Sequence, residues 1–414
     1  MPECFPFCGW FYNLEKVRPE EVLAPPYDVV TKEEIEYYKK KSPYNIFHLE
    51  LSESPSKAKE LLEKFISEKI FLQERVPTLY YHELEFEYQG KRYLRRGFIL
   101  LVKLHPFEEK IILPHEKVYN KVTEERLNLL KATSFQFSQV YALYEDPYLF
   151  TLKELPESLN FFLEVTFGTE TQRLAKIQER SVIEKILSFL KPKRFYIADG
   201  HHRYNTALKY KAYMESLYGK EEFKDYNYIS MYISPFEDEN LLMLPTYRVF
   251  KNLDGKSFLE RLKQYVIIEK ESPILNSQES FEALETAQGD FFLAFEKKLY
   301  FCRLKEEIKK VLKERDPELS ALPLWNFLQI FEEIVGVPEE KLKEEERVEF
   351  FSRQEEVLKR ASQGDLGILF PMVSPEILKK IAEKEKVMPH KSTYFYPKIL
   401  TGLVLAEVSG KRIK

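Results

Sequence analysis

The chain has 414 residues, of which 44% are hydrophobic and 14% aromatic, and its formal net charge is −4 at neutral pH. A chain of this length is too long for one simple core, so we expect two or three packed modules. The slight acidic excess argues against a protein that lives on nucleic acid, because such proteins usually carry a basic excess that replaces condensed counterions. The three cysteines include no CxxC pair, which excludes a disulfide framework and a cysteine-based zinc site.

No segment has the pattern of an export signal or a membrane span. The N-terminal residues MPECFPFCGW lack the charged-then-apolar layout of a signal peptide. The longest apolar run, around residues 98–102, has the length of a strand and is far too short to be a membrane-spanning helix. We therefore expect a cytoplasmic protein without a membrane partner.

The first half of the chain alternates short strands with amphipathic helices. The two prolines of EVLAPPYDVV exclude a helix there, and Thr31 is predicted to cap the helix that follows. Residues 56–70 have the spacing of another helix. The segments TLYYHELEFEY and RYLRRGFILLVKL predict the clearest hairpin, with its turn at Gly90. Further on we predict a strand at 138–146 and a helix at 182–190.

A predicted strand, RFYIAD at 194–199, runs directly into a helix that begins after Gly200. The apolar face of that helix is predicted to consist of Ala207, Tyr210, Met214 and Leu217.

From about residue 241 the pattern changes to that of a small α+β unit. The predicted strands are LPTYRVF, VIIEKE, FFLAFEKK and LYFCRLK, and the predicted helices include KSFLERLKQY, SFEALETA and LPLWNFLQIFEEIVG. We therefore predict a mixed α/β (α+β) protein with two modules. Residues 1–240 hold the hairpin and the strand at 194–199, and residues 241–414 form the C-terminal α+β module.

The strongest local signal is the segment Asp199-Gly200-His201-His202-Arg203 at the junction of this strand and helix. Gly200 allows a tight turn and close approach of the backbone to a ligand. The start of the following helix favours an anion, and Arg203 offers a fork of donors that matches phosphate oxygens. His202 can donate to the same group.

Asp199 and Arg203 also have simpler interpretations. Asp199 could hold a ribose hydroxyl, bind a metal ion or cap the helix. Arg203 could pair with a surface carboxylate while the histidines fill space, since short motifs often occur without function. The concentration of like charge at one helix start favours the phosphate interpretation.

Two further segments carry candidate chemistry. His115 and Glu116 lie in a predicted loop, where they could serve in acid/base catalysis or simply be solvated. The run MPHKSTYFYPK contains Lys391, Ser392 and Thr393 among aromatic residues, which gives donors for phosphate and a surface for stacking. An ordinary amphipathic strand with surface lysines would look the same.

Tyr27 and Asp28 follow the Pro-Pro pair and predict a turn with an exposed carboxylate. The usual nucleotide and hydrolase signatures GxxxxGK[ST], GxGxxG, GxSxG and HExxH do not occur in the sequence.

Five blocks of sequence, in the same order, resemble the family known as domain of unknown function 1015. They are APPYDVV with SPYNIFHLE, LPHEKV, RLNLLKAT, YIADGHHRYNTAL and MPHKSTYFYPKILTGL. The family itself has no firmly assigned activity, so this resemblance identifies relatives without identifying a reaction.

The strand–DGHHR–helix unit is also similar to the phosphate-binding motif of the ParB/sulfiredoxin superfamily, which includes CTP-dependent switches and free-serine kinases. This resemblance implies a ParB/sulfiredoxin-like nucleotide-binding core with a large β-rich insertion, because APPYDV and DGHHR lie far apart in the chain. It makes Gly200, His201, His202 and Arg203 phosphate ligands, and Asp199 a candidate for metal binding or catalysis.

Two classes of function follow. The first is an enzyme, a kinase or phosphohydrolase that acts on a small hydroxylated or phosphorylated metabolite such as serine or phosphoserine, with ATP, ADP or another nucleotide and Mg²⁺ as cofactors. The second is a nucleotide-binding switch or interaction module without turnover. We favour the enzyme, because Asp28, His115, Glu116, Asp199 and His201 could supply acid/base and metal-binding groups.

Two structural expectations accompany this hypothesis. Lys391 or Ser392 should lie near the DGHHR loop, since both offer donors of the kind found around phosphates. Replacing Arg203 by Ala should abolish ligand binding and leave the fold intact, because the apolar neighbours Ala207 and Tyr210 can hold the helix.

Overall fold

The computed structural model describes residues 1–116, 120–274 and 290–413, and the chain divides into two compact units. Unit 1 consists of residues 1–114, 118–242 and 397–414, and unit 2 of residues 115–117 and 243–396. The predicted helix SFEALETA lies outside the described residues. Among the described helices, none has the length and apolar character needed to cross a membrane.

The predicted mixed α/β class is confirmed. The C-terminal part of the chain, however, is divided between the two units. The sequence placed all of residues 241–414 in one module, whereas residues 397–414 belong to unit 1. They do so because β21 (Ala406–Glu407) pairs there with β7 (Phe135–Gln136).

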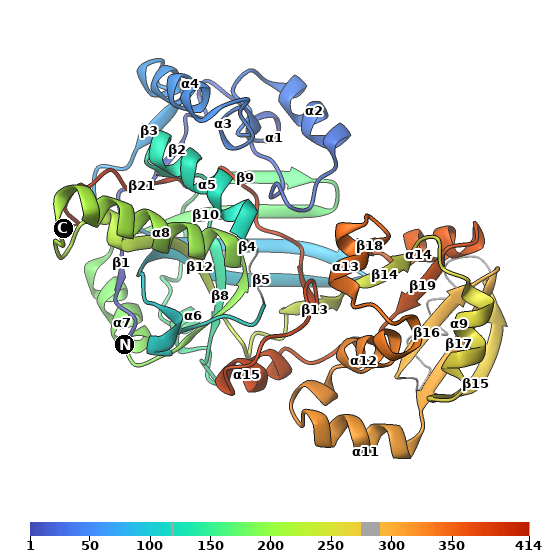
Figure 1. The fold of residues 1–414 in the computed structure, drawn as a ribbon. Helices are drawn as coiled ribbons and strands as arrows, with labels where there is room; N and C mark the ends of the chain where they lie inside the picture. Colours follow the sequence, from blue (N-terminus) through green and yellow to red (C-terminus); the bar gives the residue numbers. More distant parts are fainter. Residues whose placement is uncertain (117–119, 275–289, 414) are drawn as a thin grey trace. The chain divides into compact units, whose positions relative to one another are not determined.

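A mixed sheet of nine strands forms the centre of unit 1 (Figure 1). Its order is β6-β11-β8-β12-β5-β4-β10-β9, and β1 pairs with β5. β11 is parallel to β6 and β12 to β8, and the other pairs are antiparallel. The bounds are β1 Cys4–Phe5, β4 Leu79–Tyr88, β5 Lys91–Lys103, β6 Ile112–Leu113, β8 Val140–Tyr144, β9 Phe161–Phe167, β10 Glu170–Ile177, β11 Phe195–Asp199 and β12 Tyr228–Pro235. A separate pair consists of β2 Trp10–Tyr12 and β3 Phe71–Gln73.

The predicted hairpin is confirmed as β4 and β5, which pair from Tyr80 opposite Ile99 to Tyr88 opposite Lys91. Gly90 has φ +73° in its turn, a conformation that glycine adopts without strain. The hairpin shares its sheet with β11, the strand that precedes DGHHR.

Helix α2 (Lys32–Lys41) and helix α4 (Pro55–Ser67) of unit 1 begin at side-chain caps, Thr31 and Ser54. Thr31 accepts the backbone N–H of Glu34, and the Glu34 side chain accepts the N–H of Thr31, which is a full capping box. The bounds are α1 Pro19–Val22, α2 Lys32–Lys41, α3 Phe47–Glu50, α4 Pro55–Ser67, α5 Asn120–Thr133, α6 Phe150–Lys153, α7 Arg180–Leu190 and α8 His201–Tyr218.

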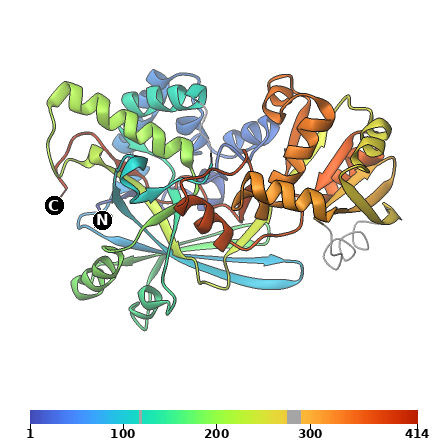
Figure 2. The ribbon, with the colours of Figure 1, turned by 60° about the horizontal axis from the view of Figure 1, so that its bottom comes forward.

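Helices α5 and α8 lie side by side in both views (Figures 1 and 2). Leu127 and Leu130 of α5 pack in one buried cluster with Tyr210 and Met214 of α8. Leu217 was predicted to extend this face but is 54% exposed. The apolar face of α8 therefore ends one turn earlier than its periodicity suggested.

The segment 397–408, which we call the C-terminal strap, crosses unit 1 in an extended path. Its backbone is fastened at several points: Thr401 N–H donates to the Ala24 carbonyl at 2.8 Å, and Leu405 N–H to the Trp10 carbonyl at 2.8 Å. The strap is thereby built into the unit, although it follows unit 2 in the chain.

Unit 2 contains an antiparallel sheet in the order β15-β17-β16-β19-β14-β18 and a separate pair, β13-β20. Its core is rich in phenylalanine; Phe250 of β14 and Phe331 of α12 stack with ring centroids 4.3 Å apart. The strands are β13 Leu242–Pro245, β14 Tyr247–Phe250, β15 Val266–Pro273, β16 Phe291–Phe295, β17 Lys298–Leu304, β18 Val348–Phe351, β19 Leu366–Leu369 and β20 Thr393–Tyr396. The helices are α9 Gly255–Leu262, α11 Glu306–Arg315, α12 Pro323–Val335, α13 Glu339–Glu344, α14 Gln354–Ser362 and α15 Glu376–Glu383.

Asp225 is a buried carboxyl group that bonds the backbone near the C-terminus. It predicts that the free energy of unfolding depends on pH. Burial raises the pKa of Asp225 to about 6, although its oxygens accept the N–H groups of Gly410 and Lys411 at 2.7 and 3.0 Å. A folded-state pKa above the unfolded one means that this contribution to stability is present at pH 4 and is lost as the pH rises through about 6.

We therefore expect Asp225→Asn to lessen the fall in melting temperature between pH 4 and pH 7. The contribution of Asp225 to that fall should be about 1–3 kcal/mol in the free energy of unfolding. Thermal melts of both proteins across this range measure the difference. If the melting temperatures of the two proteins change in parallel with pH, Asp225 has an ordinary pKa in the folded protein.

Candidate functional site

The DGHHR segment lies at the end of β11 and the start of α8, as its sequence predicts. β11 is buried up to Ala198, and its register against β8 shifts between Ile197 and Asp199. Gly200 then adopts φ +89°, and a Cβ atom there would lie 3.0 Å from Nε of Arg203. The left-handed backbone favours glycine, and a Cβ atom would also crowd the Arg203 guanidinium.

Asp199 forms ion pairs with two cations. Nη2 of Arg203 donates to Oδ2 of Asp199 at 2.6 Å, and Nζ of Lys398 donates to Oδ1. The side chains of all three residues are between 11% and 15% exposed. Burial by itself would raise the pKa of Asp199, but Lys398 and Arg203 outweigh it and lower that pKa. Asp199 is therefore a carboxylate at neutral pH, and the trio, with two cations and one anion, carries one excess positive charge.

Arg203 also binds the chain just before β8. Its Nη1 donates to Oγ of Ser138 at 3.2 Å and to the carbonyl of Gln139. Burial would lower the pKa of Arg203, but the field of Asp199, with smaller contributions from Asp28 and other groups, raises it. The predicted pairing of Arg203 with a carboxylate is therefore real, but the partner is the largely buried Asp199 of its own motif.

Glu50, the last residue of α3, extends this group and was not among the candidates from sequence. Its side chain is buried, and Oε1 accepts a hydrogen bond from Oγ of Ser138 at 3.3 Å. Oε2 is buried and has no hydrogen-bond partner within the described part of the chain. Burial raises the pKa of Glu50, which Arg126 and Arg203 partly offset. A buried carboxyl group with a raised pKa is typical of a general acid or base.

Tyr27 and Asp28 interact electrostatically with Arg203 and Glu50. The Arg126 guanidinium sits 4.2 Å from the centroid of the Tyr27 ring, and it donates to the Glu50 carbonyl at 2.8 Å. Burial raises the pKa of Tyr27 to about 12, so this residue is a neutral phenol. Asp28 is exposed, as predicted, and its charge acts on both Arg203 and Glu50. We call the residues Tyr27, Asp28, Glu50, Arg126, Ser138, Asp199, Arg203 and Lys398 the unit 1 cluster.

The two histidines of the motif lie in the first turn of α8. His201 is 6% exposed, and its ring, when protonated, lowers the pKa of Asp199. His202 is half-buried, and its carbonyl accepts a hydrogen bond from the Thr206 hydroxyl at 2.8 Å. Both lie between Asp199 and Arg203 in the chain, and their proposed roles stay predictions.

The other candidates meet in unit 2. His115 is buried, and its Nε2 lies 3.2 Å from Oγ1 of Thr393. Oε1 of Glu116 accepts the backbone N–H of Lys391 at 2.9 Å and lies 2.8 Å from Nδ1 of His390. The structure thus brings His115 and Glu116 together with the run from Lys391 to Thr393, which lies far from them in the chain.

Arg248, which is fully buried, holds the turn that carries this run. Its Nη1 and Nη2 donate to the carbonyls of Lys391 and His390 at 2.9 and 2.7 Å, and Nε donates to Glu339 at 3.0 Å. Ser392 is largely committed to the same turn, because its hydroxyl donates to the Pro389 carbonyl. The expectation that Lys391 or Ser392 lies near the DGHHR loop stays a prediction, since these residues belong to different units.

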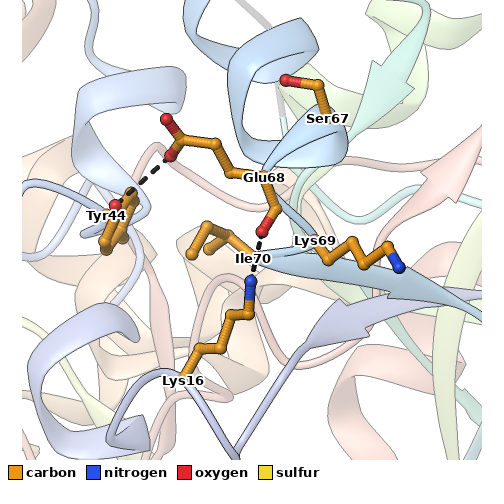
Figure 3. A pocket seen from close by; sticks show the side chains of 6 residues that line it. All are labelled: Lys16, Tyr44, Ser67, Glu68, Lys69 and Ile70. Atoms are coloured by element: carbon orange, nitrogen blue, oxygen red, sulfur yellow. Dashed lines mark hydrogen bonds between the residues drawn. The ribbon is translucent and has the colours of Figure 1, made fainter.

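A hollow of about 670 Å³ on unit 1 contains none of these candidates. Figure 3 shows its lining, in which Tyr44 donates to Glu68 at 3.3 Å and Nζ of Lys16 donates to the Glu68 carbonyl at 2.7 Å. Its two lysines, Lys16 and Lys69, are exposed. Because Tyr44 and Lys16 already bond to Glu68 within this lining, we place the candidate site at the unit 1 cluster instead.

A family model described as a protein of unknown function, DUF1015, matches residues 4–330. The chain belongs to this family. The fifth block, MPHKSTYFYPKILTGL, lies beyond the matched residues.

No curated protein sequence matches the chain. Solved structures that resemble it include a free serine kinase variant in complex with ADP, with 16% identity and a TM-score of 0.36, covering 74% of this chain and 92% of that one. A conserved hypothetical protein from Pyrococcus furiosus has 14% identity and a TM-score of 0.34, with coverage of 74% and 95%. SbnI from Staphylococcus aureus, truncated at its C-terminus, has 11% identity and a TM-score of 0.37, with coverage of 73% and 85%.

Asp199 does not fit the predicted role of ligand to a resident metal ion. Both of its carboxylate oxygens accept bonds from cations, Lys398 and Arg203. In the described ranges, no group of three or more histidine, cysteine, aspartate or glutamate residues could hold a metal ion. Binding of Mg²⁺ stays a prediction, to be tested together with a nucleotide.

Four cluster members were missed from sequence: Arg126, Ser138, Lys398 and Glu50. For Lys398 and Glu50 a signal was available. Both lie in blocks that resemble the family: Glu50 closes SPYNIFHLE, and Lys398 follows MPHKSTYFYP inside the block MPHKSTYFYPKILTGL. The signal available in the sequence was that each is a charged residue within an otherwise apolar or aromatic run.

Proposed function

We propose that unit 1 of this family member binds a nucleotide or another phosphorylated small molecule at the unit 1 cluster. The observation that supports this most directly is the Asp199–Arg203–Lys398 trio at a strand-to-helix turn. Two cations are held there with one excess positive charge, beside a helix start that favours anions. The similarity of DGHHR to the phosphate-binding motif of the ParB/sulfiredoxin superfamily supports the same assignment.

The reaction we propose is phosphoryl transfer to, or phosphate-ester hydrolysis of, a small hydroxylated metabolite such as serine or phosphoserine. In the transfer direction the substrate hydroxyl attacks the terminal phosphorus of ATP, the bond to the bridging oxygen breaks, and ADP leaves. Glu50 takes the hydroxyl proton, because it is a buried carboxyl group with a raised pKa and an oxygen without a partner among the described residues. Arg203 and Lys398 balance the charge on the phosphoryl oxygens.

A panel of ligands in thermal melts tests the binding step. ATP, ADP, AMP, inorganic phosphate, phosphoserine and serine are each added with and without Mg²⁺, at concentrations up to 1 mM. A ligand at about one hundred times its Kd adds about 2.7 kcal/mol to the free energy of unfolding, which amounts to several degrees in melting temperature. A panel in which no phosphorylated compound raises the melting temperature would contradict the proposal.

Turnover is measured separately, by following ADP release from ATP in the presence of candidate hydroxylated acceptors and phosphate release from phosphoserine. Binding together with turnover supports the enzyme. Binding of a nucleotide without turnover of any acceptor would favour the non-catalytic switch.

A further inference from the structure

One face of the unit 1 sheet carries polar side chains that are almost completely buried. Arg95 of β5 and His82 of β4 are 0% exposed, and Gln172 of β10 is 1% exposed. Arg95 and Gln172 both lie opposite Leu84 of β4, one on either side of it, so they project from the two strands that flank β4. Polar groups buried so deeply are expensive unless they bind a specific partner.

The partner of Gln172 is the C-terminal strap at Lys398. Nε2 of Gln172 donates to the Lys398 carbonyl at 3.0 Å, and Oε1 accepts the N–H of Leu400 at 3.3 Å. One side-chain amide therefore makes the two bonds that a neighbouring strand would make. The sequence separation of more than two hundred residues makes this a purely tertiary contact.

His82 adds a third hydrogen bond to this amide. Its Nε2 lies 3.0 Å from Oε1 of Gln172. Burial lowers the pKa of His82 to about 3, so the ring is neutral and can carry only one N–H. Because Oε1 can only accept, His82 is the donor at Nε2. A flipped amide would point its N–H₂ group at the Leu400 N–H and its oxygen at the Lys398 carbonyl, so Gln172 is held in one orientation.

Arg95 binds the residue before Lys398. Its Nη2 donates to the Pro397 carbonyl at 2.7 Å. The guanidinium lies over the rings of Tyr141 and Tyr232, at 5.1 and 5.8 Å from their centroids. Arg95 and Gln172 thus grip the strap at consecutive carbonyls, and between them they set the direction in which the Lys398 side chain leaves the backbone.

We infer that Arg95, Gln172 and His82 form a clamp whose function is to hold the ammonium group of Lys398 against Asp199. Gln172 and Arg95 are then positioning residues, which act on the ligand only through Lys398. The clamp as a device for placing Lys398 stands on the contacts above; its effect on ligand affinity rests on the proposed function.

A double-mutant cycle with Gln172→Met and Lys398→Met tests this coupling. Met retains the length of Gln and removes both strap bonds. With ADP as the probe, Lys398→Met should weaken binding about tenfold or more, Gln172→Met by a smaller factor, and the double variant no more than Lys398→Met alone. Losses that multiply in the double variant would show that Gln172 does not act through Lys398 and would overturn the inference.

Gln136→Met is the matched control. Its amide makes the same pair of bonds to a strand, with Nε2 donating to the Tyr228 carbonyl at 3.2 Å and Oε1 accepting the Ser230 N–H at 2.7 Å. This variant should lose melting temperature and keep its affinity for ADP. If Gln172→Met behaves in the same way, its role is only structural and the inference fails.

A second readout does not depend on any ligand. The rate at which an amine-acylating reagent modifies Lys398, followed by mass spectrometry, reports whether its ammonium group is held by Asp199. Gln172→Met should raise that rate several-fold, and Gln136→Met should leave it unchanged. If the wild-type protein binds no nucleotide, the proposed function fails, and the acylation rates alone decide the clamp.

Discussion

Replacing Glu50 by Gln should reduce phosphoryl transfer or phosphate-ester hydrolysis by about 10²–10⁴-fold, the usual contribution of a general base or acid. Nucleotide affinity should change little, because Arg203 and Lys398 remain. The variant should also melt at a higher temperature than the wild type at pH 7. Burial raises the pKa of Glu50, so its ionised form destabilises the fold as the pH rises through that value, and a neutral amide removes this cost.

A variant that is more stable than the wild type but has lost turnover would show that Glu50 acts in catalysis and is not needed for the fold. The measurements are steady-state rates, ADP affinity and thermal melts on the same preparations. Glu53→Gln is the control, since Glu53 is an exposed carboxylate shortly after Glu50. Its rates should match the wild type. Undiminished turnover in Glu50→Gln would show that another group moves the proton.

The pH dependence of the wild-type rate offers an independent check. If Glu50 is the base, kcat/KM should fall on the acid side through a pKa above that of an ordinary glutamate, because burial raises it. Glu50→Gln should remove that acid limb from any residual activity.

Arg203→Ala should weaken nucleotide binding about tenfold to a hundredfold, as expected for the loss of a charged donor to phosphate. It should also lower the free energy of unfolding by about 2–4 kcal/mol, because the largely buried Asp199 loses one of its two cations and the chain at Ser138 and Gln139 loses its anchor. This replaces the expectation from sequence that the fold would be unaffected.

The two effects are measured at a temperature where the variant is fully folded, by calorimetric titration with ADP. Arg173→Ala serves as the comparison: Arg173 joins Glu164 at 2.6 Å and Glu85 at 3.0 Å within the same sheet, away from the DGHHR turn. It should cost some stability and leave the affinity for ADP unchanged. A folded Arg203→Ala protein that binds ADP as tightly as the wild type would remove Arg203 from the ligand site.

Local features of this protein were readable from its sequence. The capping box at Thr31, the hairpin around Gly90 and the strand–glycine–helix junction at Gly200 each depend on residues within a few positions of one another. Backbone propensity, side-chain caps and the period of apolar residues act over that range, so the pattern alone determines them. The mixed α/β class followed from the same local evidence.

The tertiary structure decided which residues belong to the site. Lys398 reaches Asp199 across 199 positions, and Glu50 meets Ser138 across 88. The candidates from sequence separate into the unit 1 cluster and the His115–Thr393 group of unit 2. Contacts of this kind depend on which strands neighbour one another and on where the strap is fastened. Buried groups such as Gln172 and Arg95 determine that placement, and a single sequence does not reveal which distant residue each of them binds.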